Sequence, residues 1–488
     1  MNIYALSSGR GPSGIAIIRL SGEGALKISK LITKKKNFNY KVVNFCKFYN
    51  PSSNTLIDEG ILLSFIKPNS FTGDDLVEFH VHGSNAVITC FLNVLSELDN
   101  CRLAEPGEFT KIAFQNNKID LVEAESIGDL VHAETELQRQ QAINLIQGNA
   151  SNRYNNLREK LIKSLAFIEA KIDFAEDDLP ESVLKQVQKS IKEVHSDIKK
   201  ILEDHNVGEK IRNGFKISIV GEVNAGKSSL LNLLAKRDAA IVSSEKGTTR
   251  DIIEVYLNIN GYPVILADTA GIRDSENEIE KKGVLLAIDK SKESDLNLIM
   301  IDNSSKNIDV KTKNLINDDS IVVLNKSDVD DKIKNNFDNK DVVLVSVKEN
   351  KNIIKLTNKI KEKLSKKFMT SNNILVTRER HREKLGACLK EIDNFLAKDQ
   401  TKDKHGTLTA SIEKCRELGY ITDDRVFQVA LGSTGALEGR RKKIPKGTKK
   451  RLHALPRRAG RPNKKGKKDT DHLRNDPKYA ALIAAMDS

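Results

Sequence analysis

Hydrophobic residues follow two different periodicities along the 488-residue chain. From residue 213 onward, short apolar runs alternate with helical patterns, as in a doubly wound parallel sheet. They predict strands at 215–220, 263–267, 296–301, 320–324 and 342–345. Between 157 and 198, apolar residues recur every three or four positions. This spacing predicts helices with one buried face, formed by Leu157, Leu161, Leu165, Ile168 and Ile172, then by Leu184, Val187, Ile191, Val194 and Ile198.

These patterns predict a multidomain fold with α/β and α parts. Apolar runs at 14–20 and 76–82 suit strands of a first, mixed α/β domain. The later pattern is helical, then alternating, then helical again, which an α/β domain inserted into a helical domain explains simply. The predicted boundaries are 1–118 for the first domain, 119–210 for the first helical part, 213–370 for the insertion, and 371–398 for the return of the helical domain.

Charge separates the last part of the chain from the rest. Fifteen Lys and Arg residues and no acidic residue lie between Arg440 and Lys468, so removing this stretch lowers the formal net charge from +13 to −2. The region 399–488 is an atypical basic tail, and we predict that it is partly disordered. Its basic stretch is explained equally by contact with nucleic-acid phosphates and by a solvated tail without a partner.

Hydropathy and cysteine usage predict a cytoplasmic protein. No uninterrupted apolar run approaches the length of a membrane span, and the first residues lack the basic and apolar regions of a secretory signal. The cysteines are scattered, odd in number and without metal-ligand spacing, as expected of buried thiols in a reducing compartment: Cys46, Cys90, Cys101, Cys388 and Cys415.

A phosphate-loop motif lies between a predicted strand and a predicted helix. Residues 221–228 read Gly-Glu-Val-Asn-Ala-Gly-Lys-Ser and fit the pattern G-x-x-x-x-G-K-[ST]. In this motif backbone N–H groups wrap around phosphates at a helix N-terminus, Lys227 can reach the β- and γ-phosphates, and the Ser228 hydroxyl can ligate Mg²⁺. The predicted nucleotide contacts from this segment are Asn224, Ala225, Gly226, Lys227, Ser228 and Ser229.

Further motifs follow in the order of a guanine-nucleotide site. The segment 247–251, Gly-Thr-Thr-Arg-Asp, offers a switch-loop threonine to Mg²⁺, and Asp-Thr-Ala-Gly at 268–271 offers Asp268 to the metal shell and the Gly271 N–H to a γ-phosphate. Asp328, in Asn-Lys-Ser-Asp at 325–328, can accept two hydrogen bonds from guanine, whereas adenine has no such donor pair. With a base-side loop at Ser346, these motifs predict GTP binding through Asn325, Lys326, Asp328 and Ser346.

The group that orients the attacking water is not evident from these motifs. Many small GTPases have a glutamine directly after the glycine at the position of Gly271, but this chain has Ile272, which cannot orient water. The local candidates are the acidic residues Asp274, Glu276, Glu278 and Glu280.

Two other patterns in the first domain have ordinary interpretations. Residues 9–14 form a G-x-G-x-x-G sequence, but a β-rich run follows it where a dinucleotide site needs a helix, so we interpret it as a tight turn. His80 and His82 alternate with apolar residues and share one face of a strand. A third metal ligand is not evident nearby, which favours a structural or substrate-lining role over a metal site.

The chain closely resembles the tRNA-modification GTPases of the MnmE/TrmE family over about residues 1–398. The matching segments are 9–22 near the N-terminus, Pro-Gly-Glu-Phe-Thr at 106–110, Asn-Lys-Ile-Asp-Leu at 117–121, Glu-Ala-Glu at 123–125, Ile-Asp-Phe at 172–174 and the loop 247–251. The resemblance implies an N-terminal tetrahydrofolate-binding and dimerisation domain, a helical domain and an inserted Ras-like G domain.

The resemblance also implies an activity and partners. Members of the family hydrolyse GTP as homodimers. Together with an FAD-dependent MnmG/GidA-type protein, in a heterotetramer, they add an aminomethyl-type group to C5 of the wobble uridine of certain tRNAs. The resemblance implies that 5,10-methylene- or 5-formyl-tetrahydrofolate contacts Arg19, Glu78 and Lys118, because a pterin offers donors to Glu78 and a folate tail offers carboxylates to Arg19.

For the G domain, the resemblance implies activation by K⁺ when two G domains pair. Glu280 then corresponds to the catalytic residue that positions the water. The implied Mg²⁺ ligands are Ser228 and Thr249, the implied K⁺ ligands are Asn224, Ser243, Glu245 and Thr248, and Ser243, Thr248 and Thr249 also join the nucleotide contacts.

The sequence departs from the family in its last part. Family members end in a Cys-x-Gly-Lys motif, whereas this chain reads Ala-Met-Asp-Ser at 485–488, and Cys415 lacks the context of that motif. GTP hydrolysis is therefore expected, while modification activity is left open. The alternatives are a ribosome-assembly switch, in which hydrolysis controls RNA affinity, and a GTPase that no longer modifies tRNA.

Overall fold

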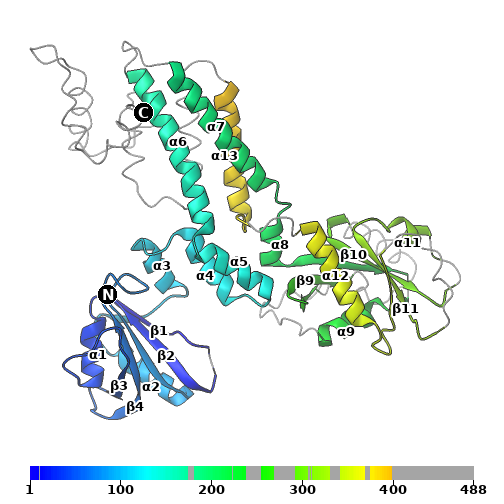
Figure 1. The fold of residues 1–488 in the computed structure, drawn as a ribbon. Helices are drawn as coiled ribbons and strands as arrows, with labels where there is room; N and C mark the ends of the chain where they lie inside the picture. The colour runs from blue at the N-terminus through cyan, green and yellow to red at the C-terminus, as the bar shows by residue number, and fades with distance from the viewer. Residues whose placement is uncertain are drawn as a thin grey trace, which may run out of the picture. The chain divides into compact units, whose positions relative to one another are not determined.

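The computed structural model describes residues 1–9, 11–173, 181–222, 224–237, 254–268, 292–305, 308, 310–329, 341–368 and 374–397 (Figure 1). Two six-stranded sheets and a set of helices make up this part of the chain, which agrees with the prediction of α/β and α parts. The described residues form two compact units, those within 1–156 with 197–386 and those within 157–196 with 387–397.

The first sheet has the strand order β3-β4-β5-β2-β1-β6. Its pairings are antiparallel except for that of β1 with β6. The predicted strands at 14–20 and 76–82 are confirmed inside β2 and β5, and β2 begins at Ser13, so a strand follows the glycines of 9–14 and the dinucleotide interpretation fails. The strands are β1 Asn2–Leu6, β2 Ser13–Ser21, β3 Asn44–Tyr49, β4 Leu56–Phe65, β5 Leu76–Gly83 and β6 Cys101–Leu103.

One face of this sheet forms a core with helices α1 (Ala25–Thr33) and α2 (Asn85–Ser96). Because side chains alternate along a strand, Val77 and Phe79 of β5 enter the core while Glu78 lies on the opposite face. The rings of Phe48, Phe79 and Phe91 pack with centroids 4.9–5.7 Å apart. The opposite face is therefore the one that presents polar side chains.

Helices α3 (Glu108–Gln115), α4 (Leu121–Val131) and α5 (Glu136–Ile146) follow the first sheet. The start of α4 is set by a capping box, in which Asp120 accepts a hydrogen bond from Glu123 N at 2.8 Å and Glu123 accepts one from Asp120 N at 2.9 Å. Thr135 and Gln138 form the same arrangement at the start of α5. Local sequence thus sets where both helices begin.

The second sheet has the order β12-β11-β10-β7-β9-β8, and its pairings are parallel except for that of β8 with β9. It is the predicted doubly wound sheet, and the five predicted strands agree with observed strands to within one residue at either end. The edge strand β8 was not predicted. The strands are β7 Phe215–Gly221, β8 Glu254–Ile259, β9 Tyr262–Asp268, β10 Leu296–Asp302, β11 Ser320–Asn325 and β12 Val342–Leu344.

Apolar side chains from outside the second sheet pack against both of its faces, which explains why its central strands are rich in apolar residues. Ile219 and Met300 pack in a core with α8 (Val207–Asn213), α9 (Lys227–Arg237) and α12 (Ile353–Phe368). Val220 and Ile301 pack in a second core on the other face, beyond which lies Leu315, just after α11 (Val310–Asn314). Residues one position apart in the sequence therefore enter different cores.

Three long helices, α6 (Asn149–Asp173), α7 (Glu181–Leu202) and α13 (Glu379–Ala397), run side by side (Figure 1). Ion pairs join Lys160 to Glu193 at 3.2 Å and His195 to Asp393 at 2.9 Å. The predicted apolar faces are confirmed where side chains are described, because Leu157, Leu161, Leu165, Ile168, Val187, Ile191, Val194 and Ile198 are buried. Within the segment 371–398, predicted as the return of the helical domain, residues 374–378 are not helical and α13 begins at Glu379.

In the described part of the chain, no helix combines the length and apolarity that crossing a bilayer requires.

The four cysteines in the described part of the chain form no disulfide and differ in exposure. Cys46 and Cys388 are buried, Cys101 is half-buried, and Cys90 is exposed. The expectation of buried thiols is therefore wrong for Cys90.

A cluster of charges joins α4 to the start of α13. Glu125 forms ion pairs with Arg378 at 3.0 Å and Arg380 at 2.8 Å, and His381, which is fully buried, lies 3.4 Å from it. Burial raises the pKa of the Glu125 carboxyl, but His381, Arg380 and Arg378 together lower it to about 2. Burial also lowers the pKa of His381, an effect that Glu125 opposes. The negative charge of Glu125 is thus needed in the folded state.

We expect Glu125→Gln to remove a pH-dependent contribution to stability. A carboxyl whose pKa falls on folding stabilises the protein fully above its ordinary pKa near 4.5, and this contribution is lost as pH falls toward 2. It amounts to about 2 kcal/mol once partial exposure is allowed for. Urea unfolding at pH values from 7 to 3 should show a gap between wild type and variant that closes below pH 4.5.

The matched control is Glu136→Gln. The pKa of Glu136 is also lowered to about 2, mainly by its hydrogen bond from Arg139, but this pair is about half exposed on the surface of α5. Water screens such a pair, so the shift should carry little stability. Equal losses in the two variants would show that burial does not decide the contribution of Glu125.

Candidate functional site

The phosphate loop connects β7 to α9 at the carboxyl edge of the second sheet. Strand β7 lies between β9 and β10, the point at which strand order reverses and where ligands bind in such sheets. Gly226 has φ +97°, and a Cβ there would overlap Asn325 Nδ2, so only glycine fits. Asn224, an exposed loop residue, has φ +62°, a conformation that asparagine tolerates. The backbone is thus shaped as the motif requires.

Lys227 folds back over the phosphate loop. Its Nζ donates to the carbonyl oxygens of Gly221 at 2.9 Å and Glu222 at 2.8 Å. Ser228 and Ser229 follow it in the first turn of α9, where backbone N–H groups have no partner within the helix. A cation and a helix N-terminus therefore converge on one loop, an arrangement that suits phosphate groups.

The predicted base-side residues lie beside the phosphate loop. Asn325, at the end of β11, donates from Nδ2 to Ala225 O at 2.8 Å and accepts at Oδ1 from Val347 N at 3.1 Å. It thereby ties the phosphate loop to the loop that contains Ser346. A hydrogen bond from Ser346 is the main cause that lowers the pKa of Asp328. The hydroxyl of Ser346 thus connects the loop after β12 to Asp328.

Asp302 is a site residue that the sequence did not suggest. It ends β10, and its Oδ2 lies 2.5 Å from Lys326 Nζ. Burial raises the pKa of the Asp302 carboxyl, but Lys326 and Ser304 outweigh it and lower the pKa overall. The ion pair holds Lys326 beside the base-side loop. Its position directly after the predicted strand 296–301 could have suggested a role at the sheet edge, but Asp302 belongs to none of the recognised motifs.

Other predicted G-domain residues divide into those that the structure describes and those that it does not. Asp268 ends β9 and is paired with Ile219 of β7, so its backbone lies at the same sheet edge as the phosphate loop. Six predicted site residues lie outside the described residues, namely Ser243, Glu245, Thr248, Thr249, Gly271 and Glu280.

A second group of predicted residues meets on the polar face of the first sheet. Arg19 of β2 and Glu78 of β5 are directly opposite in the antiparallel register, and Arg19 donates from Nε and Nη2 to Glu78 Oε1 at 3.0 and 2.7 Å. The Arg19 guanidinium lies 5.7 Å from the ring of Phe71 and 5.6 Å from that of Phe109. Neither aromatic residue was predicted as a site residue, because Phe71 lies in no motif and the family segment 106–110 implies no role for Phe109.

Lys118 is linked to this pair through the loop 66–75. Its Nζ donates to Pro68 O at 2.9 Å, and Asn116 Nδ2 donates to Thr72 O at 2.8 Å. Thr72 is also hydrogen-bonded to Ser21 of β2 at 2.7 Å between side-chain oxygens. The loop therefore brings Arg19, Glu78 and Lys118 to one region, although they are far apart in the sequence.

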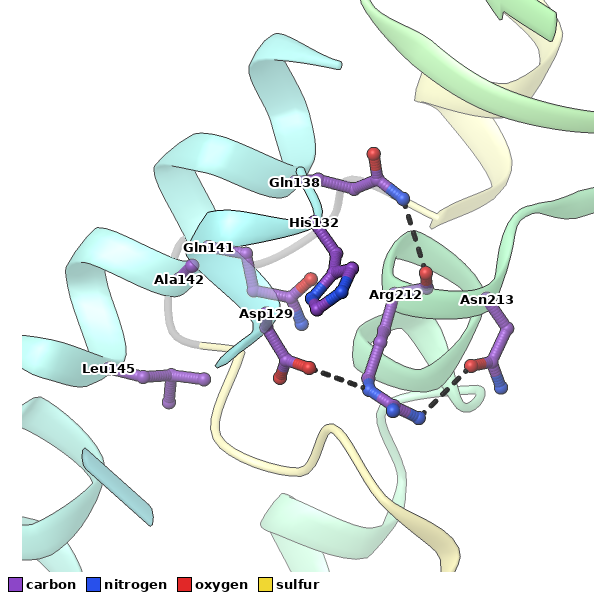
Figure 2. Close-up of a pocket in the computed structure, with 8 residues that line it drawn as sticks. All are labelled: Asp129, His132, Gln138, Gln141, Ala142, Leu145, Arg212 and Asn213. Atoms are coloured by element: carbon purple, nitrogen blue, oxygen red, sulfur yellow. Dashed lines mark hydrogen bonds and ion pairs between the residues drawn. The ribbon is translucent and has the colours of Figure 1, made fainter. Parts of the chain in front are cut away.

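A cavity of about 160 Å³ lies where α4 and α5 meet α8 (Figure 2). In it, Arg212 Nε donates to Asp129 Oδ1 at 2.9 Å, and Gln138 Nε2 donates to Arg212 O at 3.1 Å. Gln141 Nε2 donates to Gly208 O at 3.0 Å. Because these polar groups bind one another, we interpret the cavity as part of the structural contact between α5 and α8, the helix before the second sheet, and not as a ligand site.

In the described ranges, no group of three or more His, Cys, Asp or Glu side chains is arranged to hold a metal ion. His82 Nδ1 lies 2.8 Å from Asp58 Oδ1, and His80 lies beside Glu78, so the two histidines have different partners. These contacts agree with a structural or substrate-lining role.

The chain is similar to known protein families and proteins over much of its length. The family "GTP-binding protein TrmE N-terminus" matches residues 2–118, and the family "MnmE helical domain" matches residues 121–428, beyond the predicted limit of 398. The tRNA modification GTPase MnmE of Pelagibacter ubique is 57% identical over 331 residues, which are 67% of this chain and 74% of that protein. The protein of the same name from Rickettsia bellii is 47% identical over 332 residues, with the same coverage.

Solved structures match more weakly. The G domain of the T. maritima FeoB iron transporter aligns with 30% of this chain and 98% of its own, at 24% identity and a TM-score of 0.23. A score this low supports no conclusion about this chain. The family matches cover more than half of the sequence, and the first relative is covered over more than two thirds of its length. The chain therefore belongs to the MnmE family of tRNA modification GTPases.

Proposed function

We propose that this chain is a K⁺-stimulated GTPase that acts in the cytoplasm as a homodimer on tRNA. Together with an FAD-dependent MnmG-type partner, it would serve an aminomethyl-type modification at C5 of the wobble uridine. Family membership supports GTP hydrolysis in tRNA modification. The main support for GTP binding is the pair of hydrogen bonds made by Asn325. They join the phosphate loop, at Ala225 O, to the base-side loop, at Val347 N.

Contacts of the described residues support nucleotide binding. Lys227 would exchange its bonds to Gly221 O and Glu222 O for the β- and γ-phosphates, so its positive charge would move from carbonyl dipoles to full negative charges. Asp328 would accept hydrogen bonds from the guanine N1–H and amino group. Adenine lacks this donor pair, and leaving the Asp328 carboxylate unpaired opposes its binding.

The metal ions would be held by oxygen donors around the phosphate loop. A hydroxyl at Ser228 and a carboxylate at Asp268, both at the carboxyl edge of the sheet, are the hard donors that Mg²⁺ prefers, so the donor chemistry fits. Ser228 and Thr249 would hold Mg²⁺, and Asn224, Ser243, Glu245 and Thr248 would hold K⁺. Both ions supply positive charge next to the phosphates. Glu280 would position the attacking water.

The Arg19–Glu78 pair supports a tetrahydrofolate site on the first sheet, for 5,10-methylene- or 5-formyl-tetrahydrofolate. Glu78 Oε1 is used by Arg19, while Oε2 accepts no hydrogen bond from any residue that the structure describes. An N–H group of a pterin ring could donate to Oε2. Phe71 and Phe109 beside Arg19 offer apolar surface to an aromatic ligand, and Lys118 offers a cation to its carboxylates.

GTP turnover by the purified chain in KCl and in NaCl tests the proposal. Loss of one preorganised electrostatic stabiliser lowers turnover by about 10²–10³, so we expect a difference of that order between the two salts. Glu280→Ala should lower turnover in KCl by about 10²–10⁴, because it removes the group that handles the attacking water. Turnover that is indifferent to the cation and to the substitution would contradict the proposed mechanism.

A further inference from the structure

His80 lies next to Glu78 on the polar face of the first sheet. Along β5, Val77, Phe79 and Val81 enter the core, so Glu78 and His80 share the opposite face. In the register of the sheet, His80 stands between Ile17 of β2 and Ile61 of β4, both of which are half-buried. The imidazole therefore lies on the polar face of the sheet, two residues along β5 from Glu78 and its partner Arg19.

The Nε2 atom of His80 is buried and has no hydrogen-bond partner among the described residues. It lies 3.6 Å from Glu78 Oε2, which is longer than a hydrogen bond. Both donors of Arg19 go to the other oxygen, Oε1. Oε2 and Nε2 are thus two neighbouring polar atoms, one an acceptor and one a possible donor, and neither is satisfied by this part of the chain. Buried polar atoms normally have partners, so the Nε2 atom of His80 needs an explanation.

We propose that His80 is a positioning residue of the tetrahydrofolate site. In the Nε2–H tautomer, Nε2 lies 3.6 Å from Glu78 Oε2 and orients that oxygen electrostatically to accept an N–H of the ligand. The ligand class is a fused pyrimidine ring that carries an amide, as in a pterin, whose N–H group donates to Oε2. This inference rests on the proposed folate site.

His82 shows why the assignment is specific to His80. It lies two residues further along the same face of β5, but its Nδ1 already contacts Asp58 Oδ1 at 2.8 Å and its side chain is 70% exposed. Its backbone N–H also donates to Asp58 Oδ2 at 2.8 Å. His82 is therefore satisfied within the sheet, and it is a matched control for His80.

Binding of 5-formyl-tetrahydrofolate to the full chain, measured by isothermal titration calorimetry, tests the proposal. His80→Leu removes the donor with similar bulk, and we expect it to weaken binding by about tenfold, the value of one well-made hydrogen bond. His80→Gln retains an N–H donor that can reach Glu78, so binding should stay within about threefold of wild type. His82→Leu should bind like wild type. A structural role alone would not distinguish the Leu and Gln variants of His80.

Two results would overturn the assignment of His80 for different reasons. If His80→Leu binds as tightly as wild type, or His80→Gln loses as much affinity as His80→Leu, His80 does not position the ligand, although the folate site stands. If the wild-type chain does not bind, or Glu78→Gln binds equally well, the folate site itself is wrong and the role of His80 fails with it. Thermal unfolding of His80→Leu, expected at the wild-type midpoint, shows that the variant is folded.

Discussion

Lys227→Ala is expected to lower kcat/KM for GTP by at least about a hundredfold. Lys227 is the cation of the phosphate loop, and its Nζ donates to the carbonyl oxygens of Gly221 and Glu222, bonds that it would exchange for a phosphate. Charge-assisted hydrogen bonds to phosphate are about twice as strong as neutral ones, and removing one donor from a charge-stabilising site costs about 10²–10³ in rate. Steady-state phosphate release in KCl with Mg²⁺ measures the effect.

Lys236→Ala provides the control for this substitution. Lys236 lies in the last turn of the same helix, α9, and its side chain is exposed. The two variants change charge and helix composition equally, but only one changes the phosphate loop. Because alanine favours the helix slightly, neither variant should be less folded. A similar loss in both variants would mean that the net charge near the sheet, and not contact with phosphate, controls turnover.

Gly208→Ala is expected to destabilise the fold by about 3 kcal/mol or more. Gly208 lies in α8, where the chain approaches the second sheet, and a Cβ there would overlap the carbonyl oxygen of Val376 and lie 2.6 Å from Ile374 Cγ2. Overlap with backbone cannot be relieved by a rotamer change, so the two segments must separate. The separation would also strain the hydrogen bond from Gln141 to Gly208 O. Urea unfolding at pH 7 measures the loss.

Gly386→Ala tests whether the loss at Gly208 is steric. Gly386 lies in α13, and a Cβ there would have no neighbouring atom within 4 Å in the described part of the chain. Alanine stabilises a helix by about 1 kcal/mol relative to glycine, so this variant should be as stable as wild type or slightly more stable. Gly208→Ala as stable as Gly386→Ala would show that α8 and the segment after α12 are not tightly packed.

Local patterns determined the strands and the motif order of the nucleotide-binding sheet. Apolar runs of five to seven residues are strong signals when both faces of a strand are buried, as at 215–220 and 320–324. The missed strand β8 shows the limit of that signal. It is an edge strand in which Leu257 and Ile259 are buried between polar residues, so its pattern is weaker.

The sequence by itself determined the phosphate loop, the guanine motif and the residues Arg19, Glu78 and Lys118, because each lies in a continuous motif or a family resemblance. Only the tertiary structure decided which residues contact one another. The ion pair of Asp302 with Lys326 and the rings around Arg19 join residues from different strands or loops. Sheet register and loop packing determine such contacts between residues that are far apart in the sequence. The approach of His80 Nε2 to Glu78 Oε2 is a contact within β5 that depends on side-chain conformation. Composition, periodicity and motif spacing are local properties and do not predict which pairs of residues meet.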